Sequence, residues 1–363
     1  MTAILDRRLL VSRRDPGRAQ VITAESEPLP PGALRLRIDR FGLTTNNVTY
    51  AAIGDAFHYF KFFPAPAALQ GEWAGLPVWG FATVVESQAP GIAAGAGVYG
   101  FFPAAAYATL IPARDTPTGF RVERPELPPE FAVYHQYELA DRDPFHAPDR
   151  ADPAVVFRPL FLTGLLLADW LVAHDFRGAG AVVVSSASSK TAYGVAAALR
   201  RAAVQRPVIG LTSAERREFV ERLGVYDRVL EYGEVAALAR DTAAIHVDIA
   251  GGGSVRAALG DRLGDRLVLH LAVGMTHGRA DGLAPRANTE MFFAPGWLLR
   301  RSRERGPAFV TDLVAGWQAL LAGVDAHFRI RRGHGPEAAL AAARELAAGD
   351  APPDVAHVLS LAD

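Results

Sequence analysis

Hydrophobic and polar positions follow two different patterns along the chain, and the change lies near residue 160. Between Leu34 and Asp39, apolar and charged residues alternate one for one, which is the period of a half-buried strand. Other strand-like stretches, separated by Gly and Pro, are Trp79–Glu86, Val98–Phe102 and Tyr107–Ile111. We therefore expect a small, irregular β-barrel in residues 1–115.

Beyond residue 160 the chain alternates between short apolar runs and helical segments. A helix is expected over 162–176. The expected strands are Ala181–Ser185, Val208–Leu211, Arg228–Glu231, Ile245–Ile249 and Leu267–Val273, and the expected helices are about 191–203, 214–223, 233–240 and 254–263. Strands apolar at every residue are typical of a sheet buried on both faces. The alternation predicts a parallel, doubly wound sheet of the Rossmann type.

The remaining segments set the predicted domain boundaries. Residues 116–158 are polar and proline-rich, and we interpret them as connecting structure with a long loop. After about residue 297 the pattern becomes helical again, with helices expected at 312–321 and 336–347 and a last strand at 355–361. The prediction is an α/β protein: a discontinuous first domain, residues 1–155 with 300–363, and a Rossmann domain at 156–299.

Composition excludes several classes of protein. The 363 residues include 38 basic and 39 acidic side chains, so the net charge of −1 argues against a nucleic-acid binder. Half of the residues are apolar, which excludes a disordered chain. The sequence contains no cysteine and therefore no disulfide, catalytic thiolate or cysteine-ligated metal. It shows no signal peptide and no uninterrupted apolar run of about 18 residues, so we expect no membrane span and a cytoplasmic protein.

The turn after the first Rossmann strand predicts a phosphate site. Ser186, Ser188 and Ser189 stand where a dinucleotide-binding G-x-G-x-x-G turn carries glycines. The following helix begins near Lys190, one of only two lysines, and Thr191. Backbone N–H groups and the positive helix end would hold a pyrophosphate there. The alternative is an ordinary capped helix with a surface lysine.

The end of the second Rossmann strand favours NADP over NAD. An acidic residue at this position binds the ribose 2′-hydroxyl of NAD. Here the strand ends in Thr212 and Ser213, and Arg216 and Arg217 follow. Hydroxyls and guanidinium groups suit a 2′-phosphate, because arginine binds phosphate through paired, charge-assisted hydrogen bonds. The alternative is a solvated helix start.

Several sequence segments together resemble the zinc-free quinone-oxidoreductase and enoyl-reductase branch of the medium-chain dehydrogenase/reductase superfamily. The segments that carry the resemblance are 31–47, 79–86, 97–100, 163–171 and 223–232. The Ser-Ser-Lys-Thr turn, Phe62–Pro64 and the Thr276–His277 pair resemble a subfamily known only as a domain of unknown function. The resemblance implies a GroES-like β-barrel catalytic domain beside the Rossmann domain. The Gly-His-Glu of zinc alcohol dehydrogenases is absent, so no metal is expected.

The resemblance also implies how the cofactor is held. In relatives a Ser or Thr, a basic residue and a Tyr contact the 2′-phosphate of NADP, and the matching positions are Ser213, Arg216 or Arg217, and Tyr232. The strand ends contribute further positions near the cofactor, which are Gly251, Val273 and Gly274. Relatives often pair through the Rossmann sheet edge, so a homodimer is expected.

Chemistry without a metal requires hydrogen-bond donors at the substrate. The implied reaction is the NADPH-dependent reduction of an activated C=C bond or a quinone, with a proton delivered by a side chain or water. The catalytic candidates are Tyr50, Tyr59 and His277. Two of them have an ordinary alternative: Tyr50 could be a packed barrel aromatic, and a lone histidine such as His277 is more often structural. His246 and His270 are expected to be core residues.

Two other functions stay open at this point. One is a zinc-free carbonyl or alcohol oxidoreductase with the same cofactor. The other is a non-catalytic NADPH-binding protein, since the glycine loop is replaced and no obvious acid–base pair is present. For an enzyme, the expected partner is a small, apolar substrate such as a conjugated carbonyl compound or quinone, with neither nucleic acid nor membrane involved.

Overall fold

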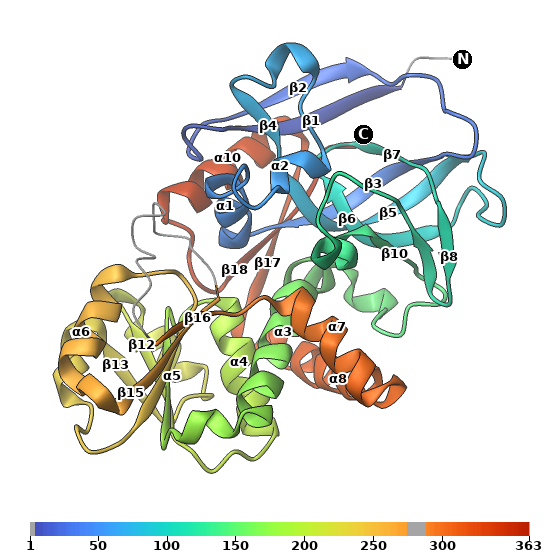
Figure 1. Cartoon of the computed structure of the whole chain (residues 1–363). Coiled ribbons are helices and arrows are strands. Elements are labelled where there is room, and N and C mark those ends of the chain that lie inside the picture. The colour runs from blue at the N-terminus through green and yellow to red at the C-terminus, as the bar shows by residue number, and fades with distance from the viewer. Residues whose placement is uncertain (1–3, 274–287, 363) are drawn as a thin grey trace. The chain divides into compact units, whose positions relative to one another are not determined.

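A computed structural model of the chain describes residues 4–273 and 288–362 (Figure 1). The chain divides into two compact units: unit 1 comprises residues 1–156 and 329–363, and unit 2 comprises 157–328. The first boundary lies next to the one expected from sequence. The second lies at Arg329, whereas the sequence pattern placed the return to the first domain at residue 300.

Unit 1 is built mainly from antiparallel sheet, with β17 (Arg329–His334) and β18 (Val355–Ser360) as a parallel pair. A small sheet has the order β2 (Ala19–Glu25), β1 (Leu5–Ser12), β4 (Trp73–Gly75). The larger sheet runs β17 (Arg329–His334), β18 (Val355–Ser360), β3 (Leu34–Leu43), β5 (Pro77–Ser87), β6 (Gly97–Pro103), β10 (Gln136–Leu139), β9 (Gly119–Arg121), β8 (Arg114–Thr116), and β7 (Tyr107–Leu110) also pairs with β3. Its core is aromatic, with Phe41, Phe101, Phe102, Phe120 and Tyr137 fully buried.

A short helix directly after β3 places the first catalytic candidate. This helix, α1 (Thr45–Ala52), begins with a capping box: the Thr44 side chain accepts from the Asn46 amide, and the Asn47 side chain accepts from the Thr44 amide at 2.8 Å. Asn47 also donates to the carbonyl of Pro77 at 2.9 Å, which ties α1 to β5. Tyr50 is thereby fixed against the barrel interior.

Unit 2 contains the predicted Rossmann sheet. Its strand order is β13 (Arg228–Glu231), β12 (Val208–Thr212), β11 (Ala181–Ser185), β14 (Ala244–Asp248), β15 (Leu267–Ala272), β16 (Thr289–Met291), and all neighbours are parallel. The helices between them are α4 (Lys190–Arg201), α5 (Arg217–Arg222), α6 (Gly253–Leu263) and the 3-10 turn η6 (Tyr232–Ala237). The prediction of an α/β protein with a GroES-like β-barrel domain and a doubly wound parallel sheet is confirmed.

The segment expected to be a long loop is more ordered than its composition indicated. It contains β9, β10, the 3-10 segment η2 (Pro129–His135) and the start of α3 (Ala151–Ala173), which was expected only from residue 162. The start of α3 is held in unit 1 because Asp152 accepts from Arg40 and Arg332. Such partners lie far away in sequence, so local polarity could not reveal them.

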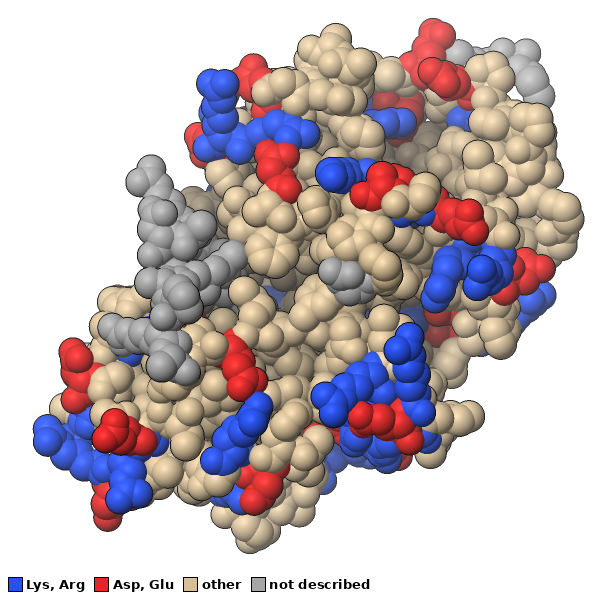
Figure 2. All heavy atoms as spheres, viewed as in Figure 1, with Lys and Arg blue, Asp and Glu red and all other residues tan. Residues whose placement is uncertain are grey.

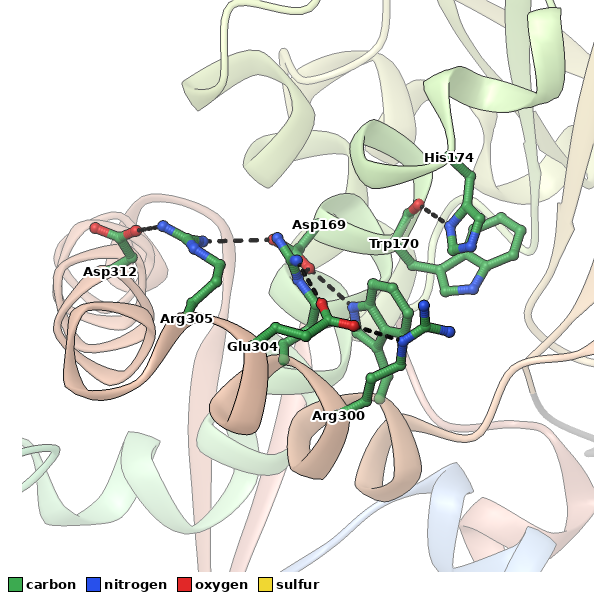
Figure 3. A network of polar contacts seen from close by, with 9 residues as sticks. Asp169, Trp170, His174, Arg300, Glu304, Arg305 and Asp312 are labelled. Atoms are coloured by element: carbon green, nitrogen blue, oxygen red, sulfur yellow. Dashed lines mark hydrogen bonds and ion pairs between the residues drawn. The ribbon is translucent and has the colours of Figure 1, made fainter.

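A polar network explains why the two helices between residues 294 and 322 belong to unit 2. Asp169, on α3, accepts from Trp297 Nε1 at 2.9 Å and from Arg301 Nε at 2.8 Å, both on α7 (Ala294–Arg305). Arg305 lies 3.7 Å from the same carboxylate and also bonds Asp312, on α8 (Pro307–Ala322) (Figure 3). One carboxylate therefore holds α7 against α3, and Arg305 extends the network to α8.

The surface shown in Figure 2 carries basic and acidic side chains beside one another, in line with the net charge of −1. Two helical stretches of the described chain, Pro148–Ala173 and Pro307–His327, are long and apolar enough to cross a membrane by length and composition alone. Core helices of soluble proteins pass the same test, and two thirds of the first stretch's apolar window is buried inside the structure. The expectation of no membrane span stays a prediction.

Candidate functional site

The residues expected to bind the cofactor gather where the parallel strands of unit 2 end. Ser186, Ser188 and Ser189 form the turn between β11 and α4. Thr212 ends β12, Tyr232 follows β13, Gly251 follows β14 and Val273 follows β15. Because the carboxyl ends of parallel strands lie on one edge of a sheet, these positions share the edge at which α/β proteins bind ligands.

The serine turn has the backbone shape that glycine usually supplies. Ser186 adopts a left-handed conformation, with φ of 53°, which is unfavourable for a residue with a side chain. Its amide donates to the hydroxyl of Tyr232 at 3.2 Å. The Ala187 amide donates to the Leu211 carbonyl at 3.0 Å, so the turn is tied to β12 as well. Tyr232 therefore lies at the serine turn.

The first turn of α4 offers backbone donors to an anion. Ser189 is the N-cap, and its side chain accepts from the Ala192 amide at 3.2 Å. The amides of Ser188 and Thr191 make no hydrogen bond with another described residue. Amides at a helix start are the groups that bind phosphate in dinucleotide folds. Lys190 begins the helix, with its Nζ 5.5 Å from the centre of the Phe328 ring.

The two arginines after β12 differ in their surroundings. Arg217 donates to Glu234 at 2.7 Å, to Glu221 at 3.0 Å and to Glu231 at 3.3 Å. Arg216 forms no ion pair with these three carboxylates. Ser213 lies beside Glu215, and a hydrogen bond between them contributes to lowering the pKa of that carboxyl, after a backbone hydrogen bond. Thr212 is almost fully buried, so its hydroxyl faces the protein interior.

A buried carboxylate organises the loop after β14. Asp248 Oδ1 accepts from the Gly251 amide at 2.9 Å and from the Ser185 hydroxyl at 3.2 Å. Its other oxygen lies 3.5 Å from Nε of Arg256, on α6. Both side chains are buried, and the Val273 amide donates to the Asp248 carbonyl at 2.8 Å. The ends of β11, β14 and β15 are thus fixed relative to each other.

Unit 1 brings together the two tyrosines that the sequence singled out. The rings of Tyr50 and Tyr59 stack with their centres 4.2 Å apart. The Tyr59 hydroxyl lies 3.5 Å from that of Tyr134, a residue that sequence reasoning missed. Asn46, Trp79 and Tyr134 lie close enough to the hydroxyl of Tyr50 to lower its pKa, although burial outweighs them. We call Tyr50, Tyr59 and Tyr134 the tyrosine cluster.

The tyrosine cluster keeps its protons at neutral pH. Burial raises the pKa of all three hydroxyls above the ordinary value of 10. The surrounding side chains are aromatic: Phe62 and Phe101 pack against the cluster, and Trp79 lies against Tyr134. Three protonated hydroxyls in an apolar shell are hydrogen-bond donors, which is the property that metal-free reduction of a carbonyl-activated bond requires.

The remaining candidates are placed as follows. His277 and Gly274 lie outside the described residues. His246 and His270 are buried core residues, as expected, with their Nδ1 atoms 2.8 Å apart across β14 and β15. No group of three or more His, Asp or Glu side chains in residues 4–273 and 288–362 is placed to hold a metal ion.

Residues 41–352 match the family described as protein of unknown function (DUF2855). The chain belongs to the DUF2855 family. The resemblance to an uncharacterised subfamily is thereby confirmed. No functionally curated protein matches the sequence.

Solved structures with the same fold include several that are described as oxidoreductases or that contain NADP or NADPH. CurA from Vibrio vulnificus, in complex with NADPH, aligns over 98% of this chain and 99% of its own, with a TM-score of 0.57 and 15% identity. The Etr1p/NADP/crotonyl-CoA complex aligns over 98% and 100%, with a TM-score of 0.59 and 11% identity. The quinone oxidoreductase from Coxiella burnetii aligns over 99% and 100%, with a TM-score of 0.54 and 14% identity. At these identities the comparison establishes the fold.

Proposed function

We propose that this protein is an NADP-dependent oxidoreductase that reduces an activated carbon–carbon double bond or a quinone without a metal ion. The observation that carries the proposal is the strand-end edge of unit 2, where a serine turn, a helix start and Tyr232 meet. CurA with NADPH and Etr1p with NADP and crotonyl-CoA share this fold, which supports both the cofactor and the substrate class.

The residues at the edge fit a dinucleotide phosphate. The amides of Ser188 and Thr191 would bind the pyrophosphate, with Lys190 contributing charge. On the second strand, Ser213 and Arg216 would bind the 2′-phosphate. Arg217 is the less suitable of the two arginines, because three carboxylates already bind it.

The bound cofactor would supply the hydride. The tyrosine cluster would act on the substrate, because a protonated hydroxyl can donate to a carbonyl oxygen that gains negative charge and can deliver the proton that completes reduction. Tyr50 and Tyr59 are the candidate donors within the described chain. The apolar substrate, the homodimer and the cytoplasmic location expected from sequence stay predictions.

The test is the consumption of NADPH and NADH by the purified protein with three substrate sets: quinones, enones with enoyl thioesters, and simple aldehydes or ketones. We expect turnover with the first or second set and NADPH. One of the two variants, Tyr50→Phe or Tyr59→Phe, should lower turnover by about 100-fold with the substrates that the unmodified protein reduces. Turnover of aldehydes alone would replace the proposal with carbonyl reduction, and tight NADPH binding without turnover would indicate a binding protein.

A further inference from the structure

We infer that Tyr134 is a positioning residue for the proton donor: its hydroxyl orients those of Tyr50 and Tyr59 and supports whichever of them gives up its proton. The inference rests on the proposed reductase function, because it concerns the proton step of that reaction. Tyr134 lies in η2, 75 residues after Tyr59, and no sequence motif marks it.

The position of Tyr134 is fixed by its ring and not by its hydroxyl. Its ring centre lies 4.7 Å from that of Phe101 and 5.9 Å from that of Trp79. It meets the Tyr59 ring edge-on at 6.1 Å. Such aromatic contacts give Tyr134 one well-packed orientation. The hydroxyl is therefore held where it reaches Tyr59 at 3.5 Å and also interacts with Tyr50.

Either hydroxyl of the Tyr59–Tyr134 contact can donate, so the role of Tyr134 follows from which proton is lost. Once Tyr59 releases its proton, its oxygen can only accept, and Tyr134 lies within reach with a proton to donate. Burial raises the pKa of Tyr134 well above the ordinary value of 10, so its hydroxyl stays protonated. Within the cluster, Tyr134 is thus the supporting donor.

The proton step can be written with every proton accounted for. When the O–H bond of Tyr50 or Tyr59 breaks, a C–H bond forms on the reduced substrate and a tyrosinate oxygen remains. Burial makes an unsupported oxyanion costly, so the hydrogen bond from Tyr134 stabilises it. The Tyr134 proton can then pass to that oxygen, and solvent water restores the proton of Tyr134. No electron moves in this step.

The experiment measures the acidity of Tyr59 directly and needs no cofactor. Tyr59 is replaced by 3,5-difluorotyrosine, whose more acidic hydroxyl can be titrated by fluorine NMR. The titration is repeated with Tyr134→Phe, which keeps the ring packing and removes the hydroxyl. The matched control is Tyr137→Phe: Tyr137 is equally buried, but its hydroxyl donates to the Phe101 carbonyl at 2.7 Å, outside the cluster.

We expect Tyr134→Phe to raise the ionisation midpoint at position 59 by about 1–2 pH units, the size of one charge-assisted hydrogen bond. Tyr137→Phe should leave it unchanged. An equal midpoint in both variants would overturn the inference, whatever the activity. With an active substrate, Tyr134→Phe should lower kcat by about 10-fold or more with little change in KM, since the lost contact acts in the transition state. If the midpoint shifts but the protein shows no reductase activity, the hydrogen bond from Tyr134 is supported and the proposed function is contradicted.

Discussion

Arg217 forms ion pairs with three glutamates that do not pair with its neighbour in sequence, Arg216. These carboxylates come from β13 and η6 as well as from its own helix. They are brought close only when β12 and β13 pair, with Thr212 opposite Glu231. The sequence could therefore predict a basic pair at the strand end, but not these three partners of Arg217.

This difference predicts separate effects on cofactor affinity. Arg216→Ala should weaken NADPH binding by about 10- to 150-fold, because one charge-assisted hydrogen bond to phosphate is worth about 1.5–3 kcal/mol. NADH affinity should stay the same. Arg217→Ala should weaken NADPH less, because that guanidinium already pairs with three carboxylates. Calorimetric titration of both variants with both cofactors measures this. If Arg217→Ala weakens NADPH binding more than Arg216→Ala does, Arg217 is the residue that contacts the 2′-phosphate.

At the scale of elements, Asp169 shows how one side chain can assign helices to a unit. Trp297 and Arg301 of α7 donate hydrogen bonds to it. Arg305 of the same helix forms an ion pair with it (Figure 3). The pattern after residue 297 predicted helices correctly, but amphipathic helices carry no local mark of the domain they join. The boundary at Arg329 depends on this long-range network and on the packing of α8, for which the sequence offered no signal.

We expect Asp169→Ala to lower the free energy of unfolding by about 1.5–3 kcal/mol, because a partly buried carboxylate with several donors is lost. The matched control is Asp312→Ala. Asp312 is 61% exposed and pairs with Arg305 alone, so its removal should cost about 1 kcal/mol or less. Urea denaturation of both variants measures the difference. Equal losses would show that the network does not hold α7 in place.

At the scale of the whole molecule, sequence reasoning located the strand-end edge well and the tyrosine cluster only in part. Five of the six described strands of the parallel sheet were predicted within two residues at each end, because strands buried on both faces are largely apolar, whereas β16 was not expected. Tyr50 was found because it follows a recognisable turn, and Tyr59 because it lies in an aromatic stretch. Tyr134 was missed, since it approaches them only after β10 has paired with β6 and β9.

Acid sensitivity of the folded chain is expected to arise in part from the core of unit 2. Burial, and to a smaller degree the charge of Arg256, lowers the pKa of His246 to about 3. In the unfolded chain its pKa is about 6.5. Below pH 6.5, His246 therefore binds a proton in the unfolded state but not in the folded state. The stability of the folded chain falls as the pH falls. The loss contributed by His246 should reach about 2 kcal/mol at pH 5 relative to pH 7.

The double variant His246→Leu/His270→Leu tests this source of acid sensitivity. It removes both partners of the buried hydrogen bond together, which avoids leaving one polar group unpaired. Hydrogen exchange of β14 and β15 amides at pH 7 and pH 5 gives the stability of unit 2. The double variant should lose about 2 kcal/mol less than the unmodified protein over this range, whereas His334→Gln, at an exposed site, should change nothing. If the double variant loses as much stability as the unmodified protein, the prediction is wrong. In that case His246 is protonated in the folded state, or other groups dominate the loss of stability at low pH.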